Sequence, residues 1–178
     1  MSAAPLRLVV LGLSLSSSWG NGHATTYRAL LKAFAARGHA VLFLERDVPW
    51  YAGHRDLPDP GFCDLALYAD LDGLAAHRAA IEAADAVIVG SYVPEGIAAG
   101  ARVLDWARGV TAFYDIDTPG TVAALEAGTC AYLAAGQIRD YDLYLSFTGG
   151  PTLRRLERDY GAPAARALYC SVDPEAYP

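Results

Sequence analysis

The sequence predicts an α/β fold in which a mostly parallel sheet of about seven strands lies between two layers of helices. Three observations predict it. Short apolar runs alternate with helical patterns along the chain, the runs are almost continuously hydrophobic, and several helical patterns stop at a glycine. With 178 residues, 53% of them hydrophobic, the chain can bury one sizeable core, so residues 1–178 are expected to form a single domain.

The expected elements follow in order from these patterns. Apolar, β-rich runs indicate strands at Leu6–Leu13, Ala40–Glu45, Asp64–Tyr68, Ala86–Gly90, Val110–Tyr114, Leu143–Phe147 and Ala167–Cys170. Apolar residues at helical spacing indicate helices between them, at His23–Arg37, Leu71–Ala84, Glu95–Arg108, Thr121–Ala135 and Thr152–Tyr160. The first, third and fifth helices end at Gly38, Gly109 and Gly161. This alternation is typical of a Rossmann-like three-layer α/β/α sandwich.

Loops that follow the strands carry the polar residues best suited to chemistry. The carboxyl ends of parallel strands meet at one edge of a sheet, so these loops are expected to converge on one ligand. The small-residue turn before the first helix lets backbone N–H groups approach an anion or a sugar hydroxyl. The expected substrate-binding residues in these loops are Trp19, Gly20, Asn21, Gly22, Glu45, Arg46, Asp47, Ser91, Tyr92, Thr148, Gly149 and Gly150.

The segment from Arg46 to Gly61 is too long and too aromatic for a simple connection, and its Trp50 and Tyr51 are also expected to bind substrate. Like Trp19, these side chains suit the C–H face of a sugar ring. The alternative role of such aromatic residues is to anchor a loop to the core. For the glycines that follow Thr148, the alternative is the geometry of a strand-to-helix turn.

Three residues are the catalytic candidates: His23 begins the first helix, and Asp115 and Asp117 follow the fifth strand. A histidine with an aspartate partner can act as a general base toward a hydroxyl group. The alternative for His23 is a helix-start residue that caps or packs, because the positive end of the helix dipole lowers the pKa of an imidazole. Helix capping ahead of Pro119 is the alternative for Asp117.

Composition argues against several classes of function. The formal net charge is −6, the isoelectric point is about 5.1 and Lys32 is the only lysine, so no nucleic acid partner is expected. The apolar run Leu8–Leu13 is too short to span a membrane, and no leader peptide is recognisable, which favours a cytoplasmic protein. Cys63, Cys130 and Cys170 are widely spaced and odd in number, so neither a disulfide framework nor a metal site is expected.

A nicotinamide-dependent enzyme is one alternative function. The turn Gly20-Asn21-Gly22-His23-Ala24-Thr25 resembles the G-x-G-x-x-G turn of dinucleotide-binding folds, and Glu45 ends the next strand at about the right distance. Thr25 stands in place of the third glycine, however, and six residues separate Leu13 from Gly20. The match is therefore partial.

Four motifs carry a resemblance to a known group of enzymes. They are Ser17-Ser18-Trp19-Gly20-Asn21-Gly22-His23-Ala24, Glu45-Arg46-Asp47-Val48-Pro49-Trp50-Tyr51, Tyr114-Asp115-Ile116-Asp117-Thr118-Pro119 and Leu145-Ser146-Phe147-Thr148-Gly149-Gly150. Nearly the whole chain resembles the N-terminal half of bacterial two-domain glycosyltransferases, and more narrowly the CgeB-like spore-maturation group. The resemblance implies a GT-B arrangement, in which two Rossmann-like domains face each other across a cleft.

The resemblance also implies a division of roles. This chain would be the acceptor-side half, with a small-molecule or glycan acceptor, no cofactor of its own and no C-terminal donor domain within it. The nucleotide-sugar donor would bind to that second domain in the full-length enzyme, so the chain alone is expected to transfer no sugar. His23, oriented by Asp115 or Asp117, would be the base of an inverting transfer, while a retaining transfer stays open. A non-catalytic domain that binds a sugar or a partner is the other alternative function.

Overall fold

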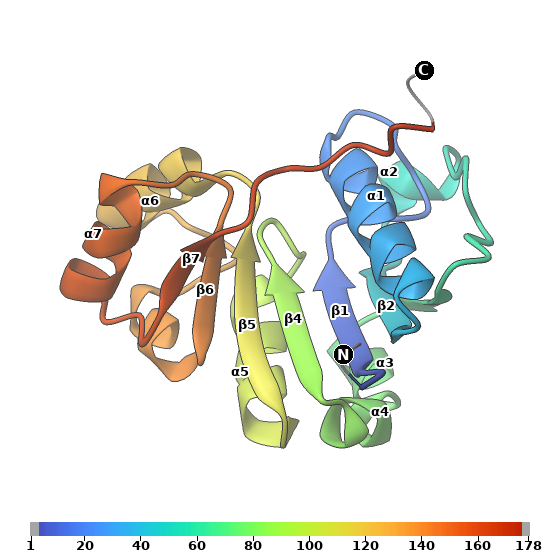
Figure 1. Cartoon of the computed structure of the whole chain (residues 1–178), viewed down its shortest axis with the longest axis horizontal. Helices are drawn as coiled ribbons and strands as arrows, with labels where there is room; N and C mark the ends of the chain where they lie inside the picture. The colour runs from blue at the N-terminus through green and yellow to red at the C-terminus, as the bar shows by residue number, and fades with distance from the viewer. Residues whose placement is uncertain (1–3, 176–178) are drawn as a thin grey trace.

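The computed structural model describes residues 4–175, which form a seven-stranded, all-parallel sheet with helices on both faces (Figure 1). The strand order is β3-β2-β1-β4-β5-β6-β7, which is the Rossmann order extended by one strand. The predicted fold class is therefore confirmed. The strands are β1 (Arg7–Gly12), β2 (Ala40–Arg46), β3 (Asp64–Tyr68), β4 (Ala86–Gly90), β5 (Val110–Asp115), β6 (Leu143–Ser146) and β7 (Ala165–Ala167).

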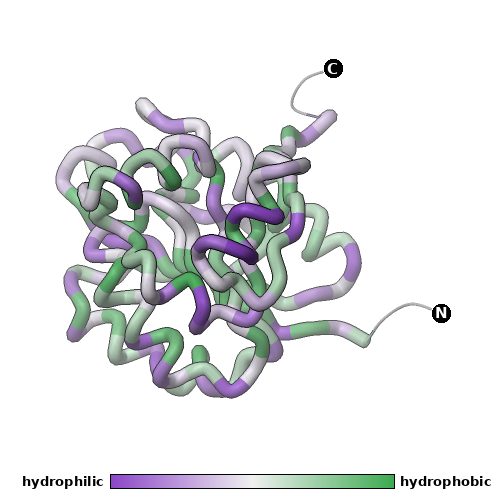
Figure 2. Tube along the Cα trace, turned by 90° about the vertical axis from the view of Figure 1, so that its left-hand side faces the viewer, coloured by the Kyte–Doolittle hydropathy of each residue, from purple (hydrophilic) through white to green (hydrophobic). Residues whose placement is uncertain are grey.

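Helices connect these strands, and no helix within residues 4–175 is long and apolar enough to cross a membrane. Along their turns hydrophilic and hydrophobic residues alternate (Figure 2), as expected for helices that bury one stripe. The helices are α1 (His23–Ala36), α2 (Pro49–Ala52), α3 (Leu71–Ala75), α4 (Arg78–Ala83), α5 (Gly96–Trp106), α6 (Thr118–Glu126), the 3₁₀ helix η1 (Ala135–Asp140) and α7 (Pro151–Tyr160).

Three predicted elements differ from the structure. The helix expected at Leu71–Ala84 is divided into α3 and α4, because tight turns at Ala76 and His77 interrupt it. α6 begins at Thr118 and not at the predicted Thr121, since Pro119 fits its first turn. It ends at Glu126, ahead of the predicted Ala135, because Gly128 has a φ of 67°. β7 precedes most of the predicted run Ala167–Cys170, because the strand pairs with β6 as soon as the chain returns from α7.

Two apolar cores hold the helices to the sheet. Val9 and Leu11 point to the core shared with α3, α4, α5, α6, η1 and α7, whereas Val10 points to the core under α1. Successive residues of β1 thus serve opposite faces, which explains why the strand is hydrophobic throughout. On the α1 side, the Tyr27 ring lies edge-on to Phe43, with ring centroids 5.2 Å apart.

The strand order reverses between β1 and β4, and the chain leaves these two strands toward opposite faces of the sheet. Such a point opens a crevice at the carboxyl ends of the strands. Glycines at both strand ends let α1 lie close to the sheet below it. An added Cβ at Gly90 would lie 1.9 Å from the Tyr27 hydroxyl oxygen, and one at Gly12 would lie 2.9 Å from the Tyr27 ring.

After β7 the chain crosses the carboxyl edge of the sheet and reaches α1, as the red segment at the top of Figure 1 shows. This segment, residues 168–175, is held to α1 by ion pairs. Lys32 Nζ lies 2.8 Å from an Asp173 oxygen and 2.6 Å from a Glu175 oxygen. The segment thus borders the crevice, and its Cys170 lines the space described next.

Candidate functional site

A cleft of about 600 Å³ opens at the carboxyl ends of β1, β4 and β5, at the sheet edge where the sequence predicts the site. Its walls come from the turn before α1, from α2, from the loops after β4 and β5, and from the C-terminal segment. Seven of its eleven lining residues are ones that the sequence predicts to bind or react. The lining residues are Leu13, Gly20, Asn21, Gly22, His23, Thr26, Tyr51, Tyr92, Ile116, Asp117 and Cys170.

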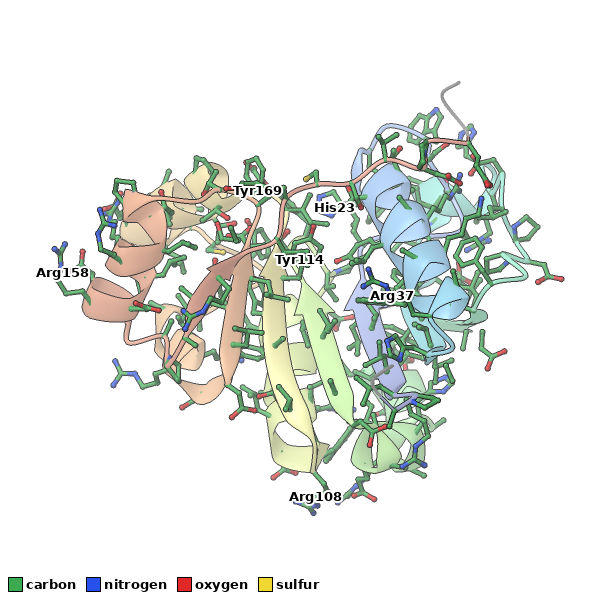
Figure 3. The ribbon with its side chains drawn as sticks, in the orientation of Figure 1. His23, Arg37, Arg108, Tyr114, Arg158 and Tyr169 are labelled. Carbon is green, nitrogen blue, oxygen red and sulfur yellow. The ribbon has the colours of Figure 1, made fainter. Side chains whose placement is uncertain are left out.

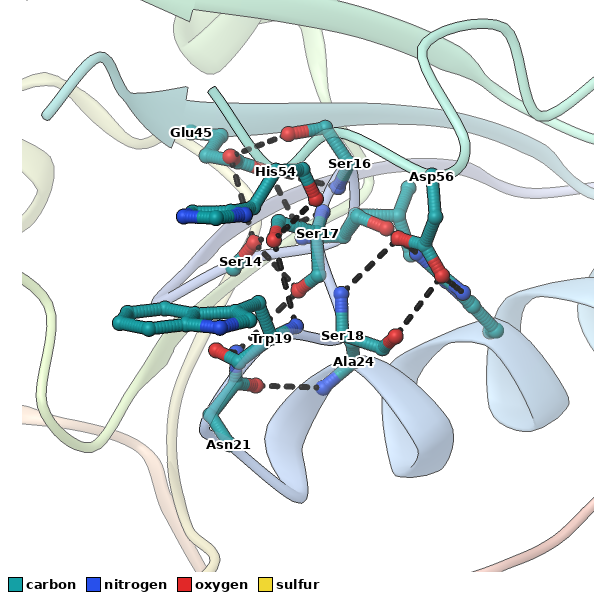
Figure 4. A network of polar contacts seen from close by, with 12 residues as sticks. Ser14, Ser16, Ser17, Ser18, Trp19, Asn21, Ala24, Glu45, His54 and Asp56 are labelled. Carbon is teal, nitrogen blue, oxygen red and sulfur yellow. Dashed lines mark hydrogen bonds and ion pairs between the residues drawn. The ribbon is translucent and has the colours of Figure 1, made fainter. Parts of the chain in front are cut away.

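Glu45 is fully buried and holds the turn that carries the glycines of the cleft (Figure 4). Its carboxylate accepts hydrogen bonds from Leu15 N (2.6 Å), Ser16 N (2.9 Å), Ser16 Oγ (2.6 Å) and Ser14 Oγ (3.3 Å). Satisfied buried carboxylates of this kind rigidify the backbone that they bind. Glu45, predicted to bind substrate, is instead a positioning residue beneath the turn.

Asp56 provides a second anchor for the same turn. It accepts two hydrogen bonds from the Arg28 guanidinium (2.7 and 3.0 Å) and two from Ser18, through N (2.9 Å) and Oγ (2.7 Å). The Arg28 hydrogen bonds, with those from Ser18, hold the pKa of Asp56 well below its usual range. Arg28 Nε also donates to Leu15 O (2.9 Å). The turn is therefore hydrogen-bonded both to Asp56 of the long loop and to Arg28 of α1.

Asn21 joins the turn to the start of α1. Its Oδ1 accepts from Ala24 N (3.1 Å), and its Nδ2 donates to Ser17 O and Trp19 O (3.2 Å each). The preceding Gly20 has a φ of 67°, a conformation that favours glycine. Gly20 and Asn21 therefore have local structural reasons, and both line the cleft together with Gly22.

His23 begins α1 and lies partly buried in the cleft (Figure 3). Burial lowers the pKa of its imidazole to about 4, although the negative charge of Asp117 acts in the opposite direction. Nδ1 is buried without a hydrogen-bond partner. The ring is therefore neutral at pH 7 and can accept a hydrogen bond from a hydroxyl, but it is a weaker base than free imidazole.

Tyr92 links this histidine to Asp117. Its hydroxyl donates to Asp117 Oδ2 (2.7 Å), and its ring stands edge-on to the His23 ring, with centroids 5.5 Å apart. Tyr92 has a φ of 63°, which costs a residue with a Cβ about 1 kcal/mol. No hydrogen bond joins His23 to Asp117 or Asp115, so the predicted histidine–aspartate contact is replaced by an arrangement with a tyrosine between the two groups.

Asp115 is fully buried at the end of β5 and does not line the cleft. It accepts from Tyr144 Oη (2.6 Å), Thr121 Oγ1 (2.7 Å) and Asp117 N (3.1 Å). Burial raises the pKa of Asp115, while these hydrogen bonds act in the opposite direction. Of the two predicted aspartates, only Asp117 faces the cleft, and Asp115 orients the backbone that carries it.

Several predicted binding residues lie outside the cleft. Arg46 pairs with Glu95 (3.1 Å), and Asp47 pairs with Arg55. Trp50 is 54% exposed and also lies outside the lining, whereas its neighbour Tyr51 is buried and lines it. The charged pairs therefore brace the long loop, and only one of its two aromatic residues reaches the site.

The remaining predicted residues support neighbouring loops. Ser91 is fully buried, and its Oγ accepts from Ile116 N (3.0 Å). Thr148 is bonded to Ser146, with its N and Oγ1 lying 3.1 and 3.0 Å from Ser146 Oγ. Gly150 has a φ of 67° at the start of α7, so the geometry of a strand-to-helix turn explains the glycine there.

Four residues at the site are not among those that the sequence predicts. Thr26 and Cys170 line the cleft, and Arg28 and Asp56 hold its turn. Thr26 and Arg28 follow His23 by three and five residues, so proximity to the predicted helix start is the signal that could have found them. Cys170 and Asp56 are distant from the other site residues in the sequence, and only the folded path of their loops brings them to the site. Within residues 4–175, no group of three or more His, Cys, Asp or Glu side chains is arranged to hold a metal ion.

Comparison with known proteins bears on the fold. No family model and no curated protein matches the sequence. One matching solved structure is an alpha-glucosyltransferase in complex with UDP and a 13-mer DNA containing a HMU base, with a TM-score of 0.62 and 16% identity over 96% of this chain and 44% of that chain. Another is an alpha-glucosyltransferase in complex with UDP-glucose and DNA containing an abasic site, with a TM-score of 0.65 and 14% identity over the same shares.

At this level of identity, the likeness shows a shared fold, and the chain spans less than half the length of both matching proteins. The comparisons do not support the narrower resemblance to the CgeB-like group. They also contradict the exclusion of nucleic acid as a partner, because both matching proteins are complexes with DNA. Net charge averages over a whole surface, whereas nucleic acid binding depends on where the cations lie.

The dinucleotide alternative fits the structure poorly. In that type of site, the acidic residue at the end of the second strand binds the ribose hydroxyls. Here Glu45 is fully buried and its oxygens already accept hydrogen bonds from Leu15 and Ser16. The turn between β1 and α1 is also long, since β1 ends at Gly12 and α1 begins at His23.

Proposed function

We propose that this chain is the acceptor-side half of a glycosyltransferase that moves a sugar from a nucleotide-sugar donor to an acceptor hydroxyl. The observation that carries the proposal is the cleft itself, in which a neutral imidazole, a tyrosine-bound carboxylate and the exposed backbone of a glycine turn surround one space. Such a set of neutral donors and acceptors with a single anion suits a hydroxylated, uncharged ligand.

The shared fold supports the proposal. Both matching proteins are alpha-glucosyltransferases, and more than half of each lies outside the match. A second domain in a longer form of this protein would place the donor against the cleft, as the GT-B arrangement requires. The reaction needs both halves, because catalysis depends on holding donor and acceptor in one geometry.

His23 and Asp117 have distinct roles in this proposal. The acceptor hydroxyl donates a hydrogen bond to the imidazole, and its proton passes to the ring as the oxygen bonds to the anomeric carbon. The bond from that carbon to the diphosphate breaks, and the nucleoside diphosphate leaves with the electron pair. Asp117 stabilises the imidazolium, since its charge already opposes the effect of burial on the His23 pKa.

Binding of an acceptor can be tested on the 178-residue chain. Titration with simple glycosides should shift the NMR signals of Gly20, Gly22 and Asp117 and of the His23 ring, and His23→Ala should weaken the binding. His77→Ala is the matched control, because His77 directly precedes α4, which lies at the other end of the sheet (Figure 1). If no glycoside moves these signals, the acceptor role is wrong.

Transfer is tested in a form of the protein that carries a donor domain. His23→Ala should lower kcat by about 10²–10⁴-fold and leave donor affinity nearly unchanged, as for the loss of a general base. A non-catalytic sugar-binding domain is the second candidate, and the low pKa of His23 is the observation that favours it. Full kcat in the alanine variant would support that second candidate.

A further inference from the structure

Trp19 and His54 form a stacked aromatic pair on the surface beside the cleft (Figure 4). Their ring centroids are 4.5 Å apart and the planes differ by 9°. Trp19 is nevertheless 53% exposed. Because one face of the indole is covered by the imidazole, this exposure belongs to its edge and its other face. An open indole face on a fixed backing ring is a surface on which another ring can stack.

The backbone around the pair is held by hydrogen bonds from both sides. Ser17 Oγ donates to His54 O (2.7 Å) and accepts from Trp19 N (3.2 Å), so one hydroxyl ties both aromatic residues together. Asn21 Nδ2 donates to Trp19 O (3.2 Å), and Leu57 N donates to Ser16 O (2.9 Å). The platform is therefore formed before any ligand arrives, which lowers the entropic cost of binding.

The charges near the platform are already paired. Arg55 binds Asp47, and Arg28 binds Asp56 through two hydrogen bonds. Arg55, the arginine that lines the hollow of about 370 Å³ at the platform, is thus already paired with a carboxylate. A nucleic acid strand would bring one negative charge with every nucleotide, whereas a neutral sugar brings none. An uncharged ring is therefore the better fit.

We infer that the Trp19–His54 pair is a stacking subsite for a pyranose ring of an oligosaccharide acceptor, next to the ring that occupies the cleft. This inference rests on the proposed function. The two sites are neighbours along the backbone, because Trp19 directly precedes Gly20, Asn21 and Gly22, which line the cleft. The indole face contacts the C–H groups of the second ring, so the subsite selects acceptors with at least two sugar units.

The test compares disaccharides with a monosaccharide on the 178-residue chain. Maltose and cellobiose are titrated against methyl glucoside, and Kd is measured by calorimetry while NMR reports the signals of Gly20 and Gly22. Trp19→Ala should weaken disaccharide binding about three- to tenfold and leave methyl glucoside binding unchanged, because it removes the indole face on which only the second ring stacks. His54→Ala, which removes the backing ring, should give a smaller loss of the same kind.

Trp50→Ala is the matched control, because Trp50 is 54% exposed, lies outside the cleft and meets Tyr51 edge-on instead of stacking. Equal affinity of Trp19→Ala and the unchanged chain for both disaccharides would overturn the inference and leave the acceptor role of the cleft intact. If neither disaccharide nor methyl glucoside moves the cleft signals, the proposed function fails as well. Tighter binding of a single-stranded oligonucleotide than of a disaccharide, lost in Trp19→Ala, would assign the platform to nucleobases and also overturn the inference.

Discussion

Replacing Glu45 by alanine removes the buried carboxylate that holds the turn before α1. The substitution leaves three buried donors without an acceptor: Leu15 N, Ser16 N and Ser16 Oγ. Ser14 Oγ keeps a partner, because it also donates to Ser17 O (2.9 Å). The turn should loosen, and the glycines that line the cleft should loosen with it.

The magnitude follows from these contacts. Each unsatisfied buried donor costs about 1–3 kcal/mol, while removal of a buried charge offsets part of that cost. We expect the free energy of unfolding to fall by about 3 kcal/mol, a large part of the roughly 5–15 kcal/mol that is typical of a domain. For a domain of this size, the midpoint of thermal unfolding should fall by about 6–12 °C.

Urea unfolding followed by tryptophan fluorescence measures the loss, and amide hydrogen exchange locates it at Leu15 and Ser16. Glu82→Ala is the control, since Glu82 forms an exposed ion pair with Arg78 on α4 and should change stability by less than about 1 kcal/mol. The role given to Glu45 is refuted if the two variants lose the same stability and both amides keep their protection.

Three further predictions concern His23, Tyr92 and Gly90. Burial lowers the His23 pKa to about 4, below the value near 6.5 of an unfolded histidine, so the unfolded chain takes up the proton first and stability is lost as the pH falls from 6.5 toward 4. Between pH 6.5 and pH 4, the His23→Asn variant should therefore lose about 1–3 kcal/mol less unfolding free energy than the unchanged chain, as measured by urea titration at both pH values. Parallel pH profiles of the two chains would contradict the lowered pKa of His23. Tyr92→Phe frees the Asp117 carboxylate, so the His23 pKa should rise above about 4 in an NMR titration, and an unchanged value would show that the phenol does not hold the carboxylate away. Gly90→Ala should destabilise the fold by about 2–4 kcal/mol in urea unfolding, because its Cβ would overlap the Tyr27 hydroxyl, while the same substitution at Gly136, where the added Cβ meets nothing within 4 Å, should cost much less.

Strand positions were predictable because buried parallel strands are hydrophobic on both faces, as Val9 and Val10 of β1 show. Predicted helix bounds failed where local turns decide them: the spacing of apolar residues in Leu71–Ala84 continues through the break between α3 and α4. β7 was misplaced because the edge strand is short and its pairing with Tyr144 is a long-range contact.

For the site, the sequence by itself determined which loops carry it, since the alternation of strands and helices places every loop after a strand at one edge. It also placed His23 at the start of a helix beyond a glycine turn. Only the tertiary structure decided what each polar group does there. Glu45 and Asp115 are buried and occupied by hydrogen bonds, whereas Asp117 lines the cleft and accepts a hydrogen bond from Tyr92. The sequence shows that a carboxylate is present, but its burial and its hydrogen-bond partners depend on residues distant along the chain.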